Sequence, residues 1–289
     1  MKKSTSNQPN TRSYLQERKC NAAKPHHEKK EEGTSRTIRL NKLVALRARC
    51  SRRDADKLIE AGRIKVDGAI AHLGMIVSEK AKITLDGRLL AHNEESFTVI
   101  VYNKPKGELV AKHDPRGRKT IYDSLPSGFK HFKPVGRLDF ASEGLLLLSD
   151  SPKVVTALMH SQLERIYLIK IDGPVTEAMI TAMKEGLSVD DASAGAHPLA
   201  PKTAMTFTPF VAFMIKKNGP TTSKLKVIIT EGQNRELRRF FGHFKRKVLD
   251  LKRVEYGGIT LNALPTGKWR YLDAKEYQSL RSYLKERES

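Results

Sequence analysis

The first ordered part of the chain carries two short helical patterns. Apolar residues from 38 to 46 predict one helix, and those from 55 to 59, spaced i, i+3, i+4, predict a second. Ser51 is placed as the N-cap of the second helix, and Asp54 three residues later completes a capping box. Gly62 is well placed to end that helix, because glycine accepts the left-handed backbone found at helix C-termini.

Two hairpins follow, each marked by an Asp-Gly pair between apolar residues. Asp67 and Gly68 lie between apolar positions at 64–70, and Asp86 and Gly87 repeat the pattern at 83–89. Asp-Gly between apolar runs favours a two-residue hairpin turn, since both central residues take positive φ. Residues 37–91 are therefore expected to form a small unit of two helices and short strands.

The longer part of the chain, residues 97–284, mixes strand and helix patterns irregularly. Alternating or continuous apolar runs predict strands and helical spacing predicts helices, while one stretch is expected to hold a strand and a loop. The expected strands are 99–102, 145–148, 167–171 and 224–229, the helices 154–160 and 177–183, and the mixed stretch 198–220. This irregular order favours an α+β fold with a mixed, largely antiparallel sheet.

Composition points to a polyanionic partner. The formal net charge is +21, and residues 1–36 are polar, with almost nothing to bury. Such a segment cannot offset its ordering entropy, so we expect a disordered basic extension. A chain this basic attracts polyanions over roughly 8 Å in physiological salt, and nucleic acid is the usual partner. An anionic membrane surface is the main rival.

Several features favour a cytoplasmic protein with no membrane partner and no metal site. No apolar run approaches the ~20 residues needed to cross a bilayer. The basic N-terminus lacks the apolar segment of a secretory signal. Only Cys20 and Cys50 are present, which do not make a disulfide scaffold, and no paired Cys/His spacing indicates zinc.

Basic residues gather on the two predicted helices away from their apolar stripe. A charge run on a helix is usually only a solvated face, but here few acids balance it and the cluster spans the joint between the helices. That placement suits phosphate contacts from one side. The cluster comprises Arg47, Arg49, Arg52, Arg53 and Lys57.

Candidate chemistry lies in residues 134–148. Asp139 stands in a loop bracketed by Gly136 and Gly144, with Arg137 two residues before it and four leucines after it. The glycines allow sharp backbone turns, and the leucines anchor the loop to a core. The pattern predicts a carboxylate fixed at the edge of an apolar sheet. Taken alone, however, an aspartate in a glycine-flanked turn is most often a turn residue.

The N-terminal unit resembles the S4-type RNA-binding domain over residues 38 to about 85. The resemblance is carried by three runs. They are Arg-Leu-Asn-Lys at 39–42, Cys-Ser-Arg-Arg-Asp-Ala-Asp at 50–56 and Ile-Glu-Ala-Gly-Arg-Ile-Lys-Val-Asp-Gly at 59–68. The resemblance covers the whole unit and implies RNA binding.

The rest of the chain resembles pseudouridine synthases. Gly136-Arg137-Leu138-Asp139, with Ser142 and Gly144, is similar to their catalytic motif. Three further segments resemble that family's motifs in the same order: 103–107, then Arg165-Ile166-Tyr167, then 231–239. With the N-terminal unit, the whole resembles the RsuA branch, which includes the RluB, RluE and RluF types. Gln233 and the run 149–151 depart from the usual pattern, which puts local loop contacts in doubt and not the reaction.

This resemblance implies site-specific isomerisation of uridine to pseudouridine in ribosomal RNA on a flipped-out base. Asp139 would be the catalytic carboxylate and Tyr167 the residue that stacks on the base. Arg238, with Arg137, would be the cationic partner of the aspartate. Arg235 and Arg239 would contact phosphates. The reaction is an isomerisation without redox or group donor, and the sequence has no glycine-rich phosphate loop, so no cofactor is expected.

Two other classes of function compete with the synthase. A pure RNA-binding protein accounts equally well for the S4-type unit and the charge, but it needs no carboxylate in a phosphate-attracting groove. An RNA methyltransferase would need a nucleotide-like cofactor site, which the sequence does not offer. The run Asn234-Arg235-Glu236 resembles the large-subunit enzymes more than the small-subunit enzyme. The expected partner is ribosomal RNA, free or in an assembling ribosomal particle.

Overall fold

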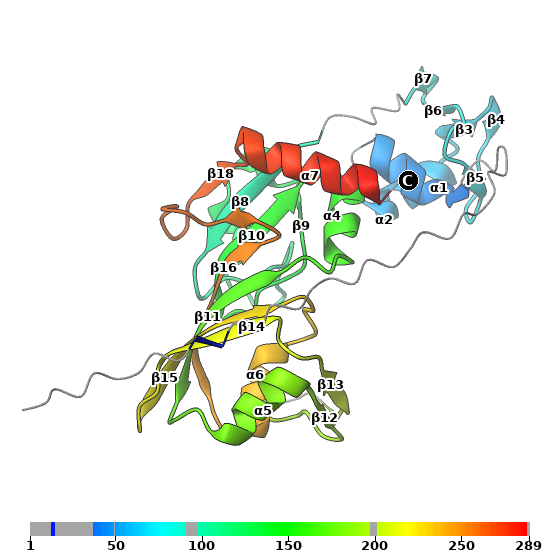
Figure 1. Ribbon diagram of the computed structural model, residues 1–289. Helices are drawn as coiled ribbons and strands as arrows, with labels where there is room; N and C mark the ends of the chain where they lie inside the picture. The colour runs from blue at the N-terminus through cyan, green and yellow to red at the C-terminus, as the bar shows by residue number, and fades with distance from the viewer. Residues whose placement is uncertain (1–12, 15–36, 49, 91–96, 197–200, 288–289) are drawn as a thin grey trace, which may run out of the picture.

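The computed structural model describes residues 13–14, 37–48, 50–90, 97–196 and 201–287 (Figure 1). Most of the expected N-terminal extension, together with Arg49, lies outside these residues. Within the extension, Ser13–Tyr14 form strand β1, which pairs antiparallel with strand β14, Ala212–Lys217. These two residues are the part of the expected extension that the structure describes.

The N-terminal unit has the predicted two helices and two hairpins. Its elements are β2 (Thr37–Arg39), α1 (Leu40–Arg47), α2 (Arg52–Glu60), β3 (Ile64–Val66), β4 (Ala69–Ile70), β5 (Ile76–Ser78), β6 (Ile83–Leu85) and β7 (Arg88–Leu89). The Oγ of Ser51 accepts the backbone N–H of Asp54 at 3.1 Å, as an N-cap does. Asp67 and Asp86 both have a φ of 50°, which is the positive φ that Asp-Gly hairpin turns require.

The larger unit is built on a ten-stranded sheet with the order β1-β14-β15-β11-β16-β10-β8-β18. The remaining strands are β8 (Val99–Lys104), β9 (Lys133–Pro134), β10 (Glu143–Ser149), β11 (Arg165–Asp172), β15 (Thr222–Ile229), β16 (Val248–Tyr256), β17 (Ile259–Thr260) and β18 (Trp269–Tyr271). The short strands β9 and β17 pair with β10 and β16. Every pairing in the sheet is antiparallel except that between β10 and β16, so the largely antiparallel α+β fold is confirmed.

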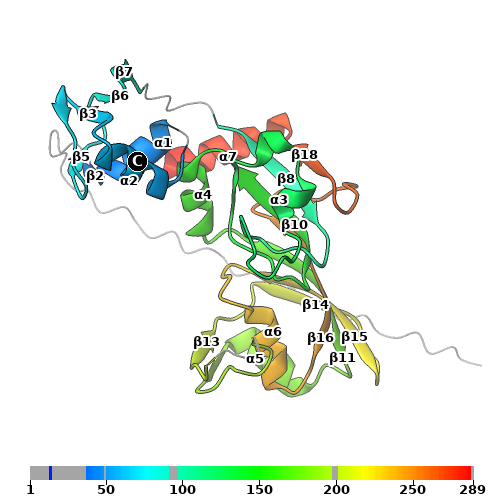
Figure 2. The same cartoon turned by 180° about the vertical axis from the view of Figure 1, so that it is seen from behind.

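Helices cover the sheet at both ends (Figures 1 and 2). They are α3 (Ile121–Ser124), α4 (Pro152–Met159), α5 (Glu177–Glu185), α6 (Glu236–His243) and α7 (Ala274–Glu286), with a short 3₁₀ turn at Ser127–Phe129. The stretch 198–220 holds two strands, β14 and β13 (Met205–Phe207), where one was expected; β13 pairs with β12 (Leu187–Val189). No helix in the described part of the chain is long and apolar enough to cross a bilayer.

The strand β10 is buried on both faces, as its run of leucines predicts. Leu146 and Leu148 enter a core that includes α5 and α6, while Leu145 and Leu147 enter a second core with α4 and α7. Alternate side chains of a strand point to opposite faces, so one apolar run serves both cores. The loop before β10 is thereby anchored between two packed layers.

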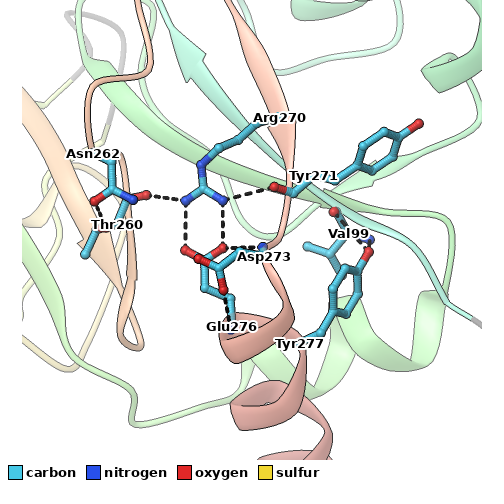
Figure 3. Close-up of polar contacts among 8 residues, drawn as sticks. All are labelled: Val99, Thr260, Asn262, Arg270, Tyr271, Asp273, Glu276 and Tyr277. Atoms are coloured by element: carbon cyan, nitrogen blue, oxygen red, sulfur yellow. Dashed lines mark hydrogen bonds and ion pairs between the residues drawn. The ribbon is translucent and has the colours of Figure 1, made fainter.

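The C-terminal helix α7 is fixed at its start by a network of charged groups (Figure 3). Asp273 caps the helix by accepting the backbone N–H of Glu276 at 2.9 Å. Arg270 donates to both carboxylate oxygens of Glu276, at 2.6 and 2.7 Å. The hydroxyl of Tyr277 accepts the backbone N–H of Val99 at 3.0 Å. These contacts tie the end of the chain to strand β8.

Candidate active site

Asp139 lies in the loop between β9 and β10, and backbone contacts hold that loop from three sides. The carbonyl oxygen of Asp139 accepts the N–H of Ser142 at 3.0 Å, and the N–H of Gly107 donates to the next carbonyl, of Phe140, at 2.8 Å. Gly144 has a φ of +105° and lies against β16, where an added Cβ would sit 2.1 Å from the carbonyl oxygen of Arg253. Any side chain at this glycine would push β10 away from β16.

A buried lysine, Lys104 at the end of β8, lies beneath this loop. Its ammonium donates to the carbonyl oxygens of Pro105 at 2.9 Å, Asp139 at 3.2 Å and Ser142 at 2.9 Å. Its side chain is fully buried, and burial lowers the pKa of Lys104 to about 8, against the opposing effect of Glu108 and other acids. Lys104 therefore fixes the aspartate loop through its backbone.

Two arginines approach one oxygen of the Asp139 carboxylate. The Nε of Arg238 lies 3.3 Å from Oδ2, and a terminal nitrogen of Arg235 lies 3.8 Å from the same oxygen. Arg238 is held in place because its guanidinium also donates to the Val248 carbonyl and the Ser142 hydroxyl, each at 3.1 Å. Burial lowers the pKa of Arg238, and the nearby Asp139 acts against this shift.

Arg137 was expected to join Arg238 beside the aspartate, and the structure places it differently. Its side chain is exposed and lines the mouth of the same cavity. Within the residues described, it forms no ion pair with Asp139. Arg137 therefore faces whatever enters the cavity and leaves the carboxylate to the two arginines of the α6 segment.

Asp139 opens onto a cavity of about 200 Å³ formed by the 135–142 loop, β11, β16 and the start of α6. Tyr167 lines the cavity from β11 and is only 6% exposed. It stands opposite Arg253 of β16 and Val227 of β15 in the sheet. Its ring packs in the main core, so Tyr167 is both a core residue and a wall of the cavity.

Three buried residues that the sequence reading gave no role form another wall of the cavity. Arg165 donates to the hydroxyl of Tyr256 at 3.0 Å, and its guanidinium carbon lies 4.7 Å from the centre of that ring. Arg253 lies over the same ring at 5.3 Å and donates to the Leu145 carbonyl at 2.7 Å. Of these three residues, only Arg165 lay in a segment that the sequence singled out, Arg165-Ile166-Tyr167.

A buried carboxyl, Glu236 at the first turn of α6, also lines the cavity. It is 4% exposed and accepts the N–H of Gln233 at 2.9 Å. Burial raises the pKa of Glu236 to about 7, although the Gln233 hydrogen bond and Arg165 act against the shift.

The residues expected to contact phosphate fall into two groups. Arg52, Arg53 and Lys57 are exposed on α2, as a phosphate-binding face requires. Arg239 is 9% exposed and donates to the Ala192 carbonyl at 2.8 Å, which contradicts a phosphate contact from this side chain. A buried guanidinium bonded to a carbonyl is not presented to RNA.

Two further arginines serve the fold or the site. Arg235 is turned toward Asp139, as described above. Arg47 belonged to the expected basic face, but its guanidinium donates to the carbonyls of Glu79 at 2.6 Å and Ala81 at 2.7 Å, so it joins α1 to the 79–81 turn.

Comparison with known protein families accounts for both units. The model of the RNA pseudouridylate synthase family matches residues 98–243, and that of the S4 domain matches residues 38–83. A solved pseudouridylate synthase superposes with a TM-score of 0.56 at 25% identity, over 84% of this chain and 99% of that one.

Two curated relatives bring the comparison closer. A Helicobacter pylori protein named as an uncharacterized RNA pseudouridine synthase is 52% identical over 249 residues, which is 86% of this chain and 95% of that protein. Ribosomal large subunit pseudouridine synthase B of Escherichia coli K12 is 36% identical over 254 residues, 84% of this chain and 82% of that one. The chain therefore belongs to the RNA pseudouridylate synthase family, in the branch with an N-terminal S4 domain.

Proposed function

We propose that this enzyme isomerises a specific uridine to pseudouridine in large-subunit ribosomal RNA, with Asp139 as its catalytic carboxylate. The reaction breaks the bond between N1 of uracil and C1′ of ribose, turns the base and joins C5 to C1′; C5 loses a proton and N1 gains one. The observation that carries the assignment is the Asp139 carboxylate, held by Arg238 at 3.3 Å on the wall of a base-sized cavity.

The pairing holds the carboxylate in place. The attraction between a guanidinium and a carboxylate within about 4 Å is stronger where water is partly excluded. The side chain of Arg238 is 10% exposed and that of Asp139 is 27% exposed. The aspartate therefore keeps access to substrate, while its partner is shielded from competing water and salt.

The cavity suits a base that has left its stack. Extruding a base costs a few kcal/mol, and stacking on an aromatic ring offsets part of this by about 1–3 kcal/mol. We propose that Tyr167 supplies this stacking surface and that Arg137, exposed at the mouth, contacts the RNA around the extruded nucleotide. The 135–142 loop then brings C1′ of the ribose to Asp139.

RNA docking is assigned to the exposed basic face of α2 in the S4 domain, comprising Arg52, Arg53 and Lys57, with Arg49 beside it in sequence. The proposed partner is ribosomal RNA or an assembling ribosomal particle, in the cytoplasm. Preference for the large subunit rests on two observations. The Asn234-Arg235-Glu236 run resembles large-subunit enzymes, and the relative of Escherichia coli is named for that subunit.

The test is chemical mapping of pseudouridine in purified ribosomal RNA of both subunits after incubation with the purified protein. One new pseudouridine in large-subunit RNA is expected. Modification confined to small-subunit RNA would overturn the choice of substrate. Tight RNA binding with no pseudouridine in any RNA, naked or in ribosomal particles, would favour the RNA-binding alternative and overturn the activity.

A further inference from the structure

Arg235 has an unusual backbone for an arginine. Its φ is +54°, in the left-handed region that residues with a Cβ seldom occupy, and it stands immediately before α6. Its Nε donates to the carbonyl oxygen of Gly195 at 2.8 Å. The same guanidinium places a terminal nitrogen 3.8 Å from Oδ2 of Asp139. The strained backbone and the Gly195 bond together aim this side chain at the carboxylate.

The loop that supplies the Gly195 carbonyl, residues 191–196, is packed against α6 backbone to backbone. A Cβ added at Gly195 would lie 2.1 Å from the Arg238 carbonyl oxygen, and one added at Gly242 would lie 2.7 Å from the Ala194 carbonyl. Such approach is possible only because both positions are glycine and carry no Cβ. The bond from Arg239 to the Ala192 carbonyl fixes the same loop one turn further along the helix.

We propose that the 191–196 loop is a positioning element for catalysis, which holds Arg235 as a second cation on the Asp139 carboxylate. This inference rests on the proposed role of Asp139. Arg235 and Arg238 approach the same oxygen, Oδ2, so they hold the carboxylate in one orientation. Arg235 thus acts through Asp139 and is a positioning residue.

The other charged groups around Asp139 do not duplicate this function. Lys104 of β8 donates to the backbone carbonyl of Asp139 and not to its carboxylate. Asp250 of β16 is paired with Lys106, and the pKa of Asp250 is lowered mainly by that bond. The side chain of Arg235 is 26% exposed, between the buried Arg238 and the open Arg137. Because it is partly exposed, the Arg235 guanidinium could also bind a phosphate of the RNA. The alternative to be tested is that Arg235 contacts phosphate instead of positioning Asp139.

The experiment compares Arg235→Gln and Arg235→Lys with the unaltered protein. The first measurement is the single-turnover rate at saturating ribosomal RNA, with RNA affinity measured in parallel. Arg235→Gln is expected to lower the rate about 10-fold, because one of the two cations that hold the Asp139 carboxylate is removed. RNA affinity should change less than about twofold, and Arg235→Lys should restore part of the rate.

A second measurement is independent of activity. Carboxyl NMR of protein carrying ¹³C-labelled aspartate follows the Asp139 resonance, identified by its loss in Asp139→Asn. In Arg235→Gln this resonance should be displaced from its position in the unaltered protein at neutral pH, because a guanidinium beside Oδ2 has been removed. Arg281→Gln, an exposed charge loss on α7, is the matched control and should leave both measurements unchanged.

The loop is tested by Gly195→Ala, which should lower the rate and displace the Asp139 resonance as Arg235→Gln does, with thermal denaturation to check that the protein remains folded. An unchanged rate and an unmoved Asp139 resonance in Arg235→Gln, with weakened RNA binding, would overturn the proposal and assign Arg235 to phosphate. Failure of the proposed function is a separate result: the unaltered protein would form no pseudouridine, whatever the NMR result.

Discussion

Arginines in two regions of this molecule carry the same charge in opposite surroundings. On α2 of the S4 domain, Arg52 and Arg53 project into solvent. Around the cavity, Arg165, Arg238 and Arg253 are 6%, 9% and 4% exposed, and each donates to backbone carbonyls or neighbouring hydroxyls. Exposed charges are screened by salt and attract phosphate with little demand on geometry. Buried charges are costly unless they are paired or hydrogen-bonded, so the partners of these arginines fix a geometry.

Under the proposed function, the two regions divide recognition from chemistry. We expect the S4 face to supply affinity that depends on salt and tolerates loss of one contact. We expect the cavity to supply a single arrangement of charge, in which loss of one partner leaves another unsatisfied. Changes in the two regions should therefore differ in size and in the property that they alter.

The largest effect is expected from Asp139→Asn, which removes the charge at the centre of the buried set. An amide is neither a nucleophile nor a base, so pseudouridine formation should fall to background while RNA affinity is retained. Product mapping beside a filter-binding titration checks both points. Substantial turnover by the purified variant would remove Asp139 from the mechanism.

Next in size is Arg238→Gln, for which the single-turnover rate should fall on the order of 10²- to 10³-fold. The amide keeps some hydrogen-bonding capacity but offers no charge to Asp139. Arg238→Lys should recover little, because an ammonium cannot reproduce the bonds to both Val248 and Ser142. Denaturation of each variant separates loss of catalysis from loss of fold. A wild-type rate in Arg238→Gln would contradict the proposal that the buried arginines of the cavity serve the chemistry.

A smaller and graded effect is expected at Tyr167. Tyr167→Phe keeps the ring and should lower the rate only several-fold, whereas Tyr167→Ala loses stacking of about 1–3 kcal/mol and should lose about 10- to 100-fold. Stopped-flow or quench kinetics at saturating RNA measures both. Equal, unaltered rates in the two variants would show that this tyrosine is purely structural.

Glu236 tests the cost of burying a charge near the cavity, and the quantity that it changes is the free energy of unfolding. Its raised pKa, about 7, means that the folded protein keeps a proton which the unfolded chain releases near its ordinary value of about 4.5. Stability should therefore fall as pH rises from about 4.5 to about 7, by up to roughly 3 kcal/mol, and be flat above that range. Glu236→Gln should remove this dependence and stabilise the protein most above pH 7. Urea denaturation at pH 5, 7 and 8.5 measures it; parallel curves for both proteins would contradict the assignment.

The smallest effect on turnover is expected from the double change Arg52→Ala and Arg53→Ala. Affinity for RNA should fall, and the log–log salt dependence of binding should flatten by about one to two units. The rate at saturating RNA should stay nearly intact while the apparent Michaelis constant rises. Alanine favours helix, so α2 should persist. A titration at several salt concentrations decides: unchanged slope and affinity would mean that this face is only solvated.

Local sequence signals predicted the S4 domain well. The Ser51 cap, the end at Gly62 and both Asp-Gly turns depend on residues within a few positions of one another, and each is present. The helix α6 and the strand β16 were not predicted. Charged residues interrupt the apolar pattern of both elements. Arg238, Arg239 and Arg253 are nevertheless buried, because they donate hydrogen bonds to residues far away in the sequence.

The candidate site was predictable only where a local motif marks a residue. Family motifs pointed to Asp139, Tyr167 and Arg238. In the structure Asp139 and Tyr167 line one cavity, and Arg238 pairs with Asp139. The motifs could not predict that Lys104 donates to three backbone carbonyls. Nor could they predict that Arg235, expected to contact phosphate, lies beside the Asp139 carboxylate. Those outcomes depend on which loop meets which helix, and that is decided by tertiary packing.

The position of β16 between β10 and β11 has a consequence for how the protein is made. Leu145 and Arg253 are joined by a hydrogen bond across 108 positions of the chain, and their strands form the parallel pair of the sheet. As the chain leaves the ribosome, the S4 domain, whose contacts are local, can fold early. We expect strands β10 and β11 to remain with unpaired edges until β16 has been synthesised and inserts between them. The nascent chain should therefore form its S4 domain before the cavity at Asp139.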